Sequence, residues 1–62
     1  MRERVFVGHG IEVYRYGERF WIRYDAGEIV QSYREVEVSH AEAMRAMQSE
    51  HDAYDVLVGR AP

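Results

Sequence analysis

The fold is decided by residues 11–25, which read Ile11-Glu12-Val13-Tyr14-Arg15-Tyr16-Gly17-Glu18-Arg19-Phe20-Trp21-Ile22-Arg23-Tyr24-Asp25. Two runs rich in β-branched and aromatic residues flank Gly17-Glu18, and a two-residue turn with glycine in its first central position is typical of a tight hairpin. We therefore predict antiparallel strands over 11–16 and 19–25. The turn sets the register, in which Tyr14 lies opposite Trp21 and Val13 opposite Ile22.

Glycine-containing segments on either side extend the hairpin into a meander. We interpret Gly8-His9-Gly10 and Asp25-Ala26-Gly27 as three-residue loops, which predicts further strands over 3–7 and 28–38. In these registers Val7 faces Ile11, Val5 faces Val13, Tyr24 faces Glu28 and Ile22 faces Val30.

The predicted registers place most aliphatic side chains on one face of the sheet, as a core requires. Arg15, Ser32 and Arg34 interrupt this pattern and are expected at the periphery. The expected core face consists of Val5, Val7, Ile11, Val13, Phe20, Ile22, Tyr24, Val30, Val36 and Val38.

A helix should follow the last strand. Ser39 and Glu42 have the spacing of a capping box, which predicts a helix over 40–51 at least, with Ala43, Met44 and Met47 on the sheet. Residues 53–58 either extend this helix as far as Gly59, its expected C-cap, or form a short fifth strand; we favour the helix. The spacing of an α-helix is shared by His40, Met44, Met47, His51, Tyr54 and Val58. The predicted fold class is α+β, an antiparallel meander of three to four strands followed by one C-terminal helix packed on one sheet face.

Composition narrows the class of protein. The 62 residues suffice for one small domain, 1–62, and the absence of cysteine excludes disulfides and thiolate zinc sites. No apolar run reaches the length of a membrane span and the N-terminal apolar stretch is too short for a secretory signal, so we expect a cytoplasmic protein. All eight fixed cations are arginine, which reflects either a GC-rich genome or a use of arginine for stacking and bidentate pairing.

The second face of the predicted sheet is unusually aromatic for one turned toward water. It collects Phe6, Tyr14, Tyr16, Trp21, Ile29 and Tyr33, interleaved with Arg4, Glu12, Arg19, Arg23 and Gln31. Aromatic side chains and arginine are enriched at interface hot spots, whereas a merely structural face would reflect the high β-propensity of Tyr and Trp. The candidate partner-binding residues are Tyr14, Tyr16, Arg19, Trp21, Arg23 and Tyr33.

Catalytic and metal-binding motifs were not found. On a helix, His40 and His51 would stand about 16 Å apart, too far to share an ion, and His9 between two glycines is typical of a turn. Ser39 is better explained as a helix cap than as a nucleophile. We expect neither catalytic activity nor a cofactor.

These features favour a non-enzymatic protein–protein interaction module that self-associates, with a homodimer expected, or inhibits a larger partner. Small size, acidity and a rich interaction surface are similar in kind to phage- and plasmid-encoded inhibitors, anti-defence proteins among them, although no motif carries that likeness. The alternative is a small nucleic-acid-binding regulator whose aromatic face stacks bases, which the net charge of −3 disfavours. A second candidate surface is an acidic strip that could dock on a basic partner, formed by Glu35, Glu37, Glu42, Glu50, Asp52 and Asp55.

Overall fold

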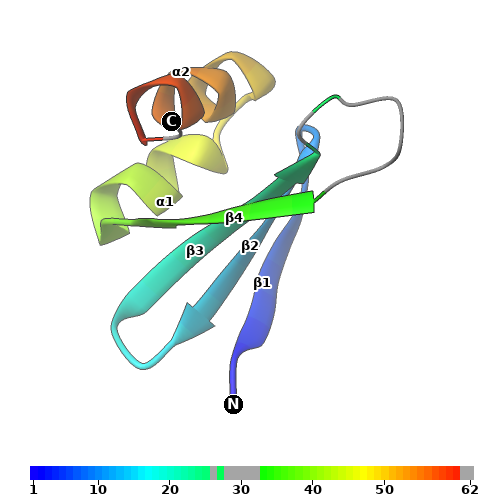
Figure 1. Ribbon diagram of the computed structural model, residues 1–62. Coiled ribbons are helices and arrows are strands. Elements are labelled where there is room, and N and C mark those ends of the chain that lie inside the picture. Colours follow the sequence, from blue (N-terminus) through cyan, green and yellow to red (C-terminus); the bar gives the residue numbers. More distant parts are fainter. Residues whose placement is uncertain (26, 28–32, 61–62) are drawn as a thin grey trace.

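The computed structural model describes residues 1–25, 27 and 33–60. Within these residues the chain forms one antiparallel sheet in the order β1-β2-β3-β4, followed by two helices that lie on one side of it (Figure 1). The elements are β1 Glu3–Gly8, β2 Ile11–Tyr16, β3 Arg19–Asp25, β4 Tyr33–Val38, α1 His40–Ala46 and α2 Glu50–Arg60. The α+β meander is confirmed, but a second helix replaces the single one predicted.

The central hairpin has the predicted register. Tyr14 pairs with Trp21, Val13 with Ile22 and Tyr16 with Arg19 across β2 and β3. Gly17 has a φ of 62°, in the left-handed region that glycine adopts more readily than residues with a Cβ, so glycine is favoured at this first turn position.

The β1–β2 hairpin differs from the prediction by one residue. His9 and Gly10 have φ values of 53° and 77°, the two positive angles of a type I′ turn, so Gly8 rather than Val7 lies opposite Ile11. A slip of one residue exchanges the faces of a strand. Phe6 therefore lies opposite Val13 and packs against the core, whereas Val7 lies opposite Glu12 and is 60% exposed.

A β-bulge between Arg4 and Phe6 ends this slip. Beyond it Arg4 lies opposite Tyr14, as the three-residue loop predicted, and Val5 is the extra residue. Val5 is 40% exposed and does not belong to the buried core. The prediction was thus wrong for Val5, Phe6 and Val7, because a two-residue turn followed by a bulge replaces the three-residue loop.

The register between β3 and β4 differs from the prediction. Ile22 lies opposite Val36 rather than Val30, and Tyr24 opposite Arg34 rather than Glu28, so the register is displaced by six residues. The last pair in the described residues is Asp25 opposite Tyr33. The predicted positions of Val30 and of Ile29, Gln31 and Ser32 lie outside the described residues. Because six is even, Val36 and Val38 keep the core face that alternation assigned to them.

The helical region is divided by a second N-cap. The capping box of Ser39 and Glu42 is confirmed, but α1 ends with Met47 as its C-cap. The Ser49 hydroxyl then accepts a hydrogen bond from the Asp52 amide at 3.0 Å and starts α2. Residues 53–58 are helical as favoured, in this second helix, and Gly59 lies inside it instead of capping it.

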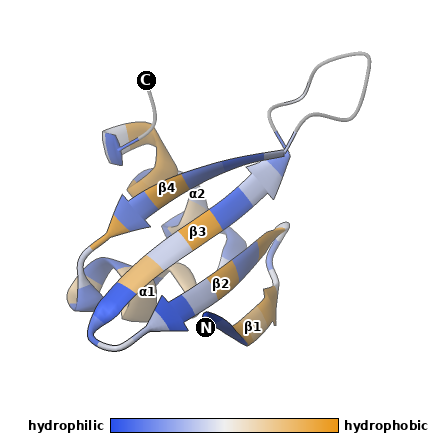
Figure 2. Cartoon of the chain, turned by 60° about the horizontal axis from the view of Figure 1, so that its bottom comes forward, coloured by the Kyte–Doolittle hydropathy of each residue, from blue (hydrophilic) through white to orange (hydrophobic). Residues whose placement is uncertain are grey.

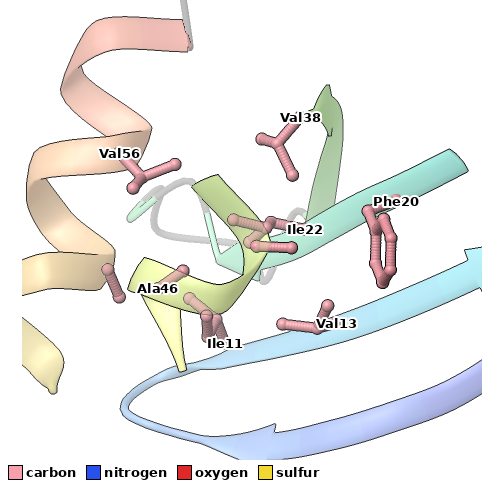
Figure 3. Packing of buried hydrophobic residues seen from close by; sticks show 9 residues of the cluster. Ile11, Val13, Phe20, Ile22, Val38, Ala46 and Val56 are labelled. Carbon is pink, nitrogen blue, oxygen red and sulfur yellow. The ribbon is translucent and has the colours of Figure 1, made fainter. Parts of the chain in front are cut away.

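The core lies between the sheet and the helices, where α1 packs on β3 and α2 on β4 (Figure 3). Met47 packs against the core as predicted, whereas Met44, predicted to cover the sheet, is 37% exposed, because α1 buries the face that carries Ala43 and Ala46. Ala53 and Val56 of α2 are buried in the core instead. The buried residues are Ile11, Val13, Phe20, Ile22, Val38, Ala43, Ala46, Ala53 and Val56.

Candidate functional site: the open sheet face

Both helices lie on one face of the sheet and leave the other, which we call the open face, toward the viewer in Figure 2. Alternation along the paired strands brings all the predicted partner-binding residues onto it. These are Tyr14 and Tyr16 of β2, Arg19, Trp21 and Arg23 of β3, and Tyr33 of β4.

An aromatic pair under an arginine forms the centre of the open face. Tyr14 and Trp21 are directly opposite each other and partly buried. The Arg2 guanidinium lies 4.7 Å from the Tyr14 ring centroid and 5.7 Å from that of Trp21. The Arg19 guanidinium also lies over the Trp21 ring, 5.2 Å from its centroid. Cation–π contacts of this kind contribute about 0.5–1 kcal/mol each at exposed sites.

The same arginines are held by carboxylates of β4. Arg2 donates two hydrogen bonds to Glu35, at 2.6 and 2.8 Å, and Arg19 donates two to Glu37, both at 2.8 Å. These hydrogen bonds hold the pKa values of both glutamates below their usual range. Both carboxylates are therefore ionised at neutral pH, and the arginines are fixed in position by bidentate pairing.

Glu12 organises the other end of the open face. Its carboxylate accepts a hydrogen bond from Arg4 at 3.2 Å and one from the Tyr14 hydroxyl at 3.3 Å, and it lies 3.9 Å from Arg23. Arg23 in turn lies over the Tyr33 ring, 4.5 Å from its centroid. Glu12 therefore connects β1, β2 and β3 across the face.

Three exposed side chains surround this ordered centre. Tyr16 and Tyr33 are 53% and 51% exposed, and Val7 is 60% exposed. The described charged residues that pair across this face are four arginines (2, 4, 19 and 23) and three glutamates (12, 35 and 37), a balance of +1. The open face is aromatic, accessible at its edges and nearly neutral.

Sequence reasoning missed part of this site. Glu35 and Glu37 alternate with Val36 and Val38, a signal that places them on this face, yet they were assigned only to the acidic strip. Arg2 precedes the first strand, and no pattern in the sequence indicates that it reaches Glu35. Phe6 was expected here but belongs to the core side.

The proposed acidic strip is largely neutralised. Besides Glu35 and Glu37, Glu42 is paired with Arg60 at 2.6 Å. Asp52 and Asp55 both contact Arg45, at 3.2 and 3.0 Å, which ties α2 to α1. A strip whose acids already hold arginines offers little negative charge to a basic partner.

Among the residues that the structure describes, no group of three or more His, Asp or Glu side chains is arranged to hold a metal ion. In the same residues no helix is long and apolar enough to cross a membrane.

The chain is thus a small α+β domain with a helix-covered and an open sheet face. Comparison with protein-family models, curated proteins and solved structures found no match.

Proposed function

We propose that this chain is a non-enzymatic protein–protein interaction module that acts in the cytoplasm and binds its partner through the open face. The observation that carries the proposal is the central Tyr14–Trp21 pair with arginines stacked on it, on a face that the described helices leave uncovered. Tyrosine, tryptophan and arginine are the residues most enriched among interface hot spots. A small inhibitor that blocks a larger protein would need a surface of this kind.

Support for a protein rather than a nucleic-acid partner comes from the way the arginines are used. Arg2 and Arg19 each direct two donors to a glutamate, and Arg4 donates to Glu12. Affinity for a phosphate backbone grows with the number of phosphates that free cations neutralise. To bind phosphates, these arginines would first have to give up their glutamate partners. The glutamates left unpaired would then repel the phosphate backbone of the nucleic acid.

The test compares partner capture by the parent chain with capture by Trp21→Ala and Tyr33→Ala variants. Tyr54→Ala is the matched control, because Tyr54 is 65% exposed on α2, which lies on the other side of the sheet from the open face. A protein captured from the source cell is identified, purified and titrated against all four chains. We expect Trp21→Ala to weaken binding about thirtyfold or more, and Tyr54→Ala to leave it unchanged.

Folding of each variant is checked by circular dichroism, and Tyr33→Ala serves as the second probe because its half-exposed side chain carries little of the core. If Trp21→Ala and Tyr33→Ala bind as tightly as the control, the open face is not the interface. Labelled single-stranded DNA and RNA are titrated in parallel at low and moderate salt. Tight, salt-sensitive binding that is lost in Trp21→Ala would instead establish the nucleic-acid function.

A further inference from the structure

The open face has an internal symmetry in its charges and rings. The strand registers arrange its side chains in rows that run across the sheet. One row holds Arg4, Tyr14, Trp21 and Glu37; the next holds Val7, Glu12, Arg23 and Glu35; a third holds Tyr16 and Arg19. In each of the first two rows the outer strand β4 contributes a glutamate, and β2 adds Glu12 to the second row.

We propose that the partner of the open face is a second copy of this chain, docked face to face about a two-fold axis that runs parallel to the strands between β2 and β3. This inference rests on the proposed function. A two-fold interface uses the same surface on both copies, so that surface must complement itself. The proposed axis exchanges β1 with β4 and β2 with β3 while it keeps each row in place.

Under this operation the charged residues of the three rows meet an opposite charge or a ring, except Glu35, which lies over Val7 of the second copy. Arg4 lies over Glu37 of the second copy, and Glu12 lies over Arg23 of the second copy. Two further pairs involve rings: Tyr14 lies over Trp21 of the second copy, and Tyr16 over Arg19 of the second copy. Two sheets packed this way are expected to cross at about 30° because each is twisted.

The charges disfavour a second face-to-face arrangement, with the axis perpendicular to the strands. A two-fold axis perpendicular to the strands, through the row of Tyr14 and Trp21, would place Arg23 over Arg19 of the second copy. Like charges in contact across an interface cost several kcal/mol. The distribution of arginine and glutamate therefore selects the axis parallel to the strands.

Size and spacing agree with a sheet-on-sheet dimer. Strands about 4.8 Å apart and about 20 Å long give a face of roughly 400 Å² in projection. Protruding side chains such as Tyr16 and Tyr33 raise its accessible area toward the roughly 800 Å² per partner of a standard interface. Packed sheets lie about 10 Å apart. The Arg2 guanidinium lies 4.7 Å from the Tyr14 centroid and is neutralised by Glu35, so covering it leaves no unpaired charge.

The Arg4–Glu37 pair tests the arrangement, because these residues belong to opposite edge strands and lie about 14 Å apart within one sheet. Both remain accessible, with side chains 56% and 46% exposed. Arg4→Glu alone and Glu37→Arg alone each place like charges together twice per dimer. We expect each variant to self-associate at least about tenfold more weakly than the parent. An equimolar mixture should form a heterodimer, since each of its two contacts again joins opposite charges.

Self-association of the parent, of each variant and of the mixture is measured by sedimentation velocity, and the composition of the dimers by native mass spectrometry. Glu3→Arg and Arg15→Glu are matched controls, because this exposed ion pair lies at the edge of the helix-covered side. A preferred heterodimer with unaffected controls supports the proposal. A parent that stays monomeric, or a mixture that shows no preference for the heterodimer, overturns it. If the parent is monomeric and Trp21→Ala still abolishes capture of another protein, this inference fails while the proposed function stands.

Discussion

The register of β1 gives the sharpest test of the fold, because it inverts the roles that simple alternation assigns to Phe6 and Val7. In the structure the Phe6 ring packs against the core, stacks on His9 at 5.5 Å and lies over Gly8, where an added Cβ would come within 3.0 Å of Cζ. Val7 points to the open face and is 60% exposed. Phe6→Ala and Val7→Ala therefore differ sharply in cost here, and in the opposite sense if the alternation-based register held.

Truncation of a fully buried phenylalanine costs about 3–5 kcal/mol. Phe6 is only partly buried, on an edge strand, so we expect Phe6→Ala to lower the free energy of unfolding by about 2–3 kcal/mol. A domain of this size has about 3–5 kcal/mol in total. Val7→Ala should change it by no more than about 0.5 kcal/mol.

Urea unfolding followed by the fluorescence of Trp21, the single tryptophan, measures both costs. With a denaturant dependence of about 1 kcal/mol per molar, Phe6→Ala should lower the midpoint by about 2–3 M and Val7→Ala by less than about 0.5 M. The assay is run at low micromolar protein, so that the proposed self-association, which would cover Val7, does not affect the result. A Val7→Ala variant that loses as much stability as Phe6→Ala would refute the two-residue turn and the bulge.

Further variants test the helix termini, the turns and the pH dependence. Ser39→Ala should lower the free energy of unfolding by about 1 kcal/mol in the same urea assay, since the cap of α1 is lost; an unchanged midpoint would contradict the capping box. Gly10→Ala should cost about 1–2 kcal/mol because its φ is 77°, whereas Gly59→Ala, in open space inside α2, should stabilise by about 0.5 kcal/mol; equal signs would be inconsistent with these conformations. Hydrogen bonds from Arg60, and from the Ser39 amide, lower the pKa of Glu42 from 4.5 to about 2. The folded pKa lies below the unfolded one, so this contribution is complete above about pH 4.5 and is lost as the pH falls toward 2. Glu42→Gln should flatten that part of the pH–stability curve, and a parallel curve would show that Glu42 does not contribute.

The central hairpin could be predicted because its turn leaves one choice. Gly17-Glu18 allows a two-residue turn, and that turn determines every pair of β2 and β3. The register of β4 could not be predicted, because alternation has a period of two and is equally satisfied by registers that differ by six residues. Asp25-Ala26-Gly27 resembles a turn, so Val30 was placed where the structure has Val36. This error did not change the face on which each side chain of β4 lies, so Tyr33 is on the open face as predicted.

Odd displacements and breaks in periodicity are harder to foresee. Gly8-His9-Gly10 accommodates both a two- and a three-residue loop, and only the φ of 53° at His9 distinguishes them. The helical spacing of apolar residues continues across the break between α1 and α2, so periodicity alone suggested one helix. Ser49 and Asp52 repeat the spacing of Ser39 and Glu42, which is the signal that could have revealed the second cap.

The use of arginine bears on the kind of partner that the open face fits. Arg2 and Arg19 each lie against a ring and donate two hydrogen bonds to a carboxylate, a combination that the ammonium group of lysine cannot make. Covering an unpaired charge is costly, whereas a charge that keeps its partner and its hydrogen bonds loses much less on desolvation. The glutamates thus prepare these arginines to be covered by another molecule. A partner therefore does not have to carry a large opposite charge. It has to offer a large contact surface with aromatic side chains and a few charges in complementary positions. A second open face, turned about the axis between β2 and β3, has that composition.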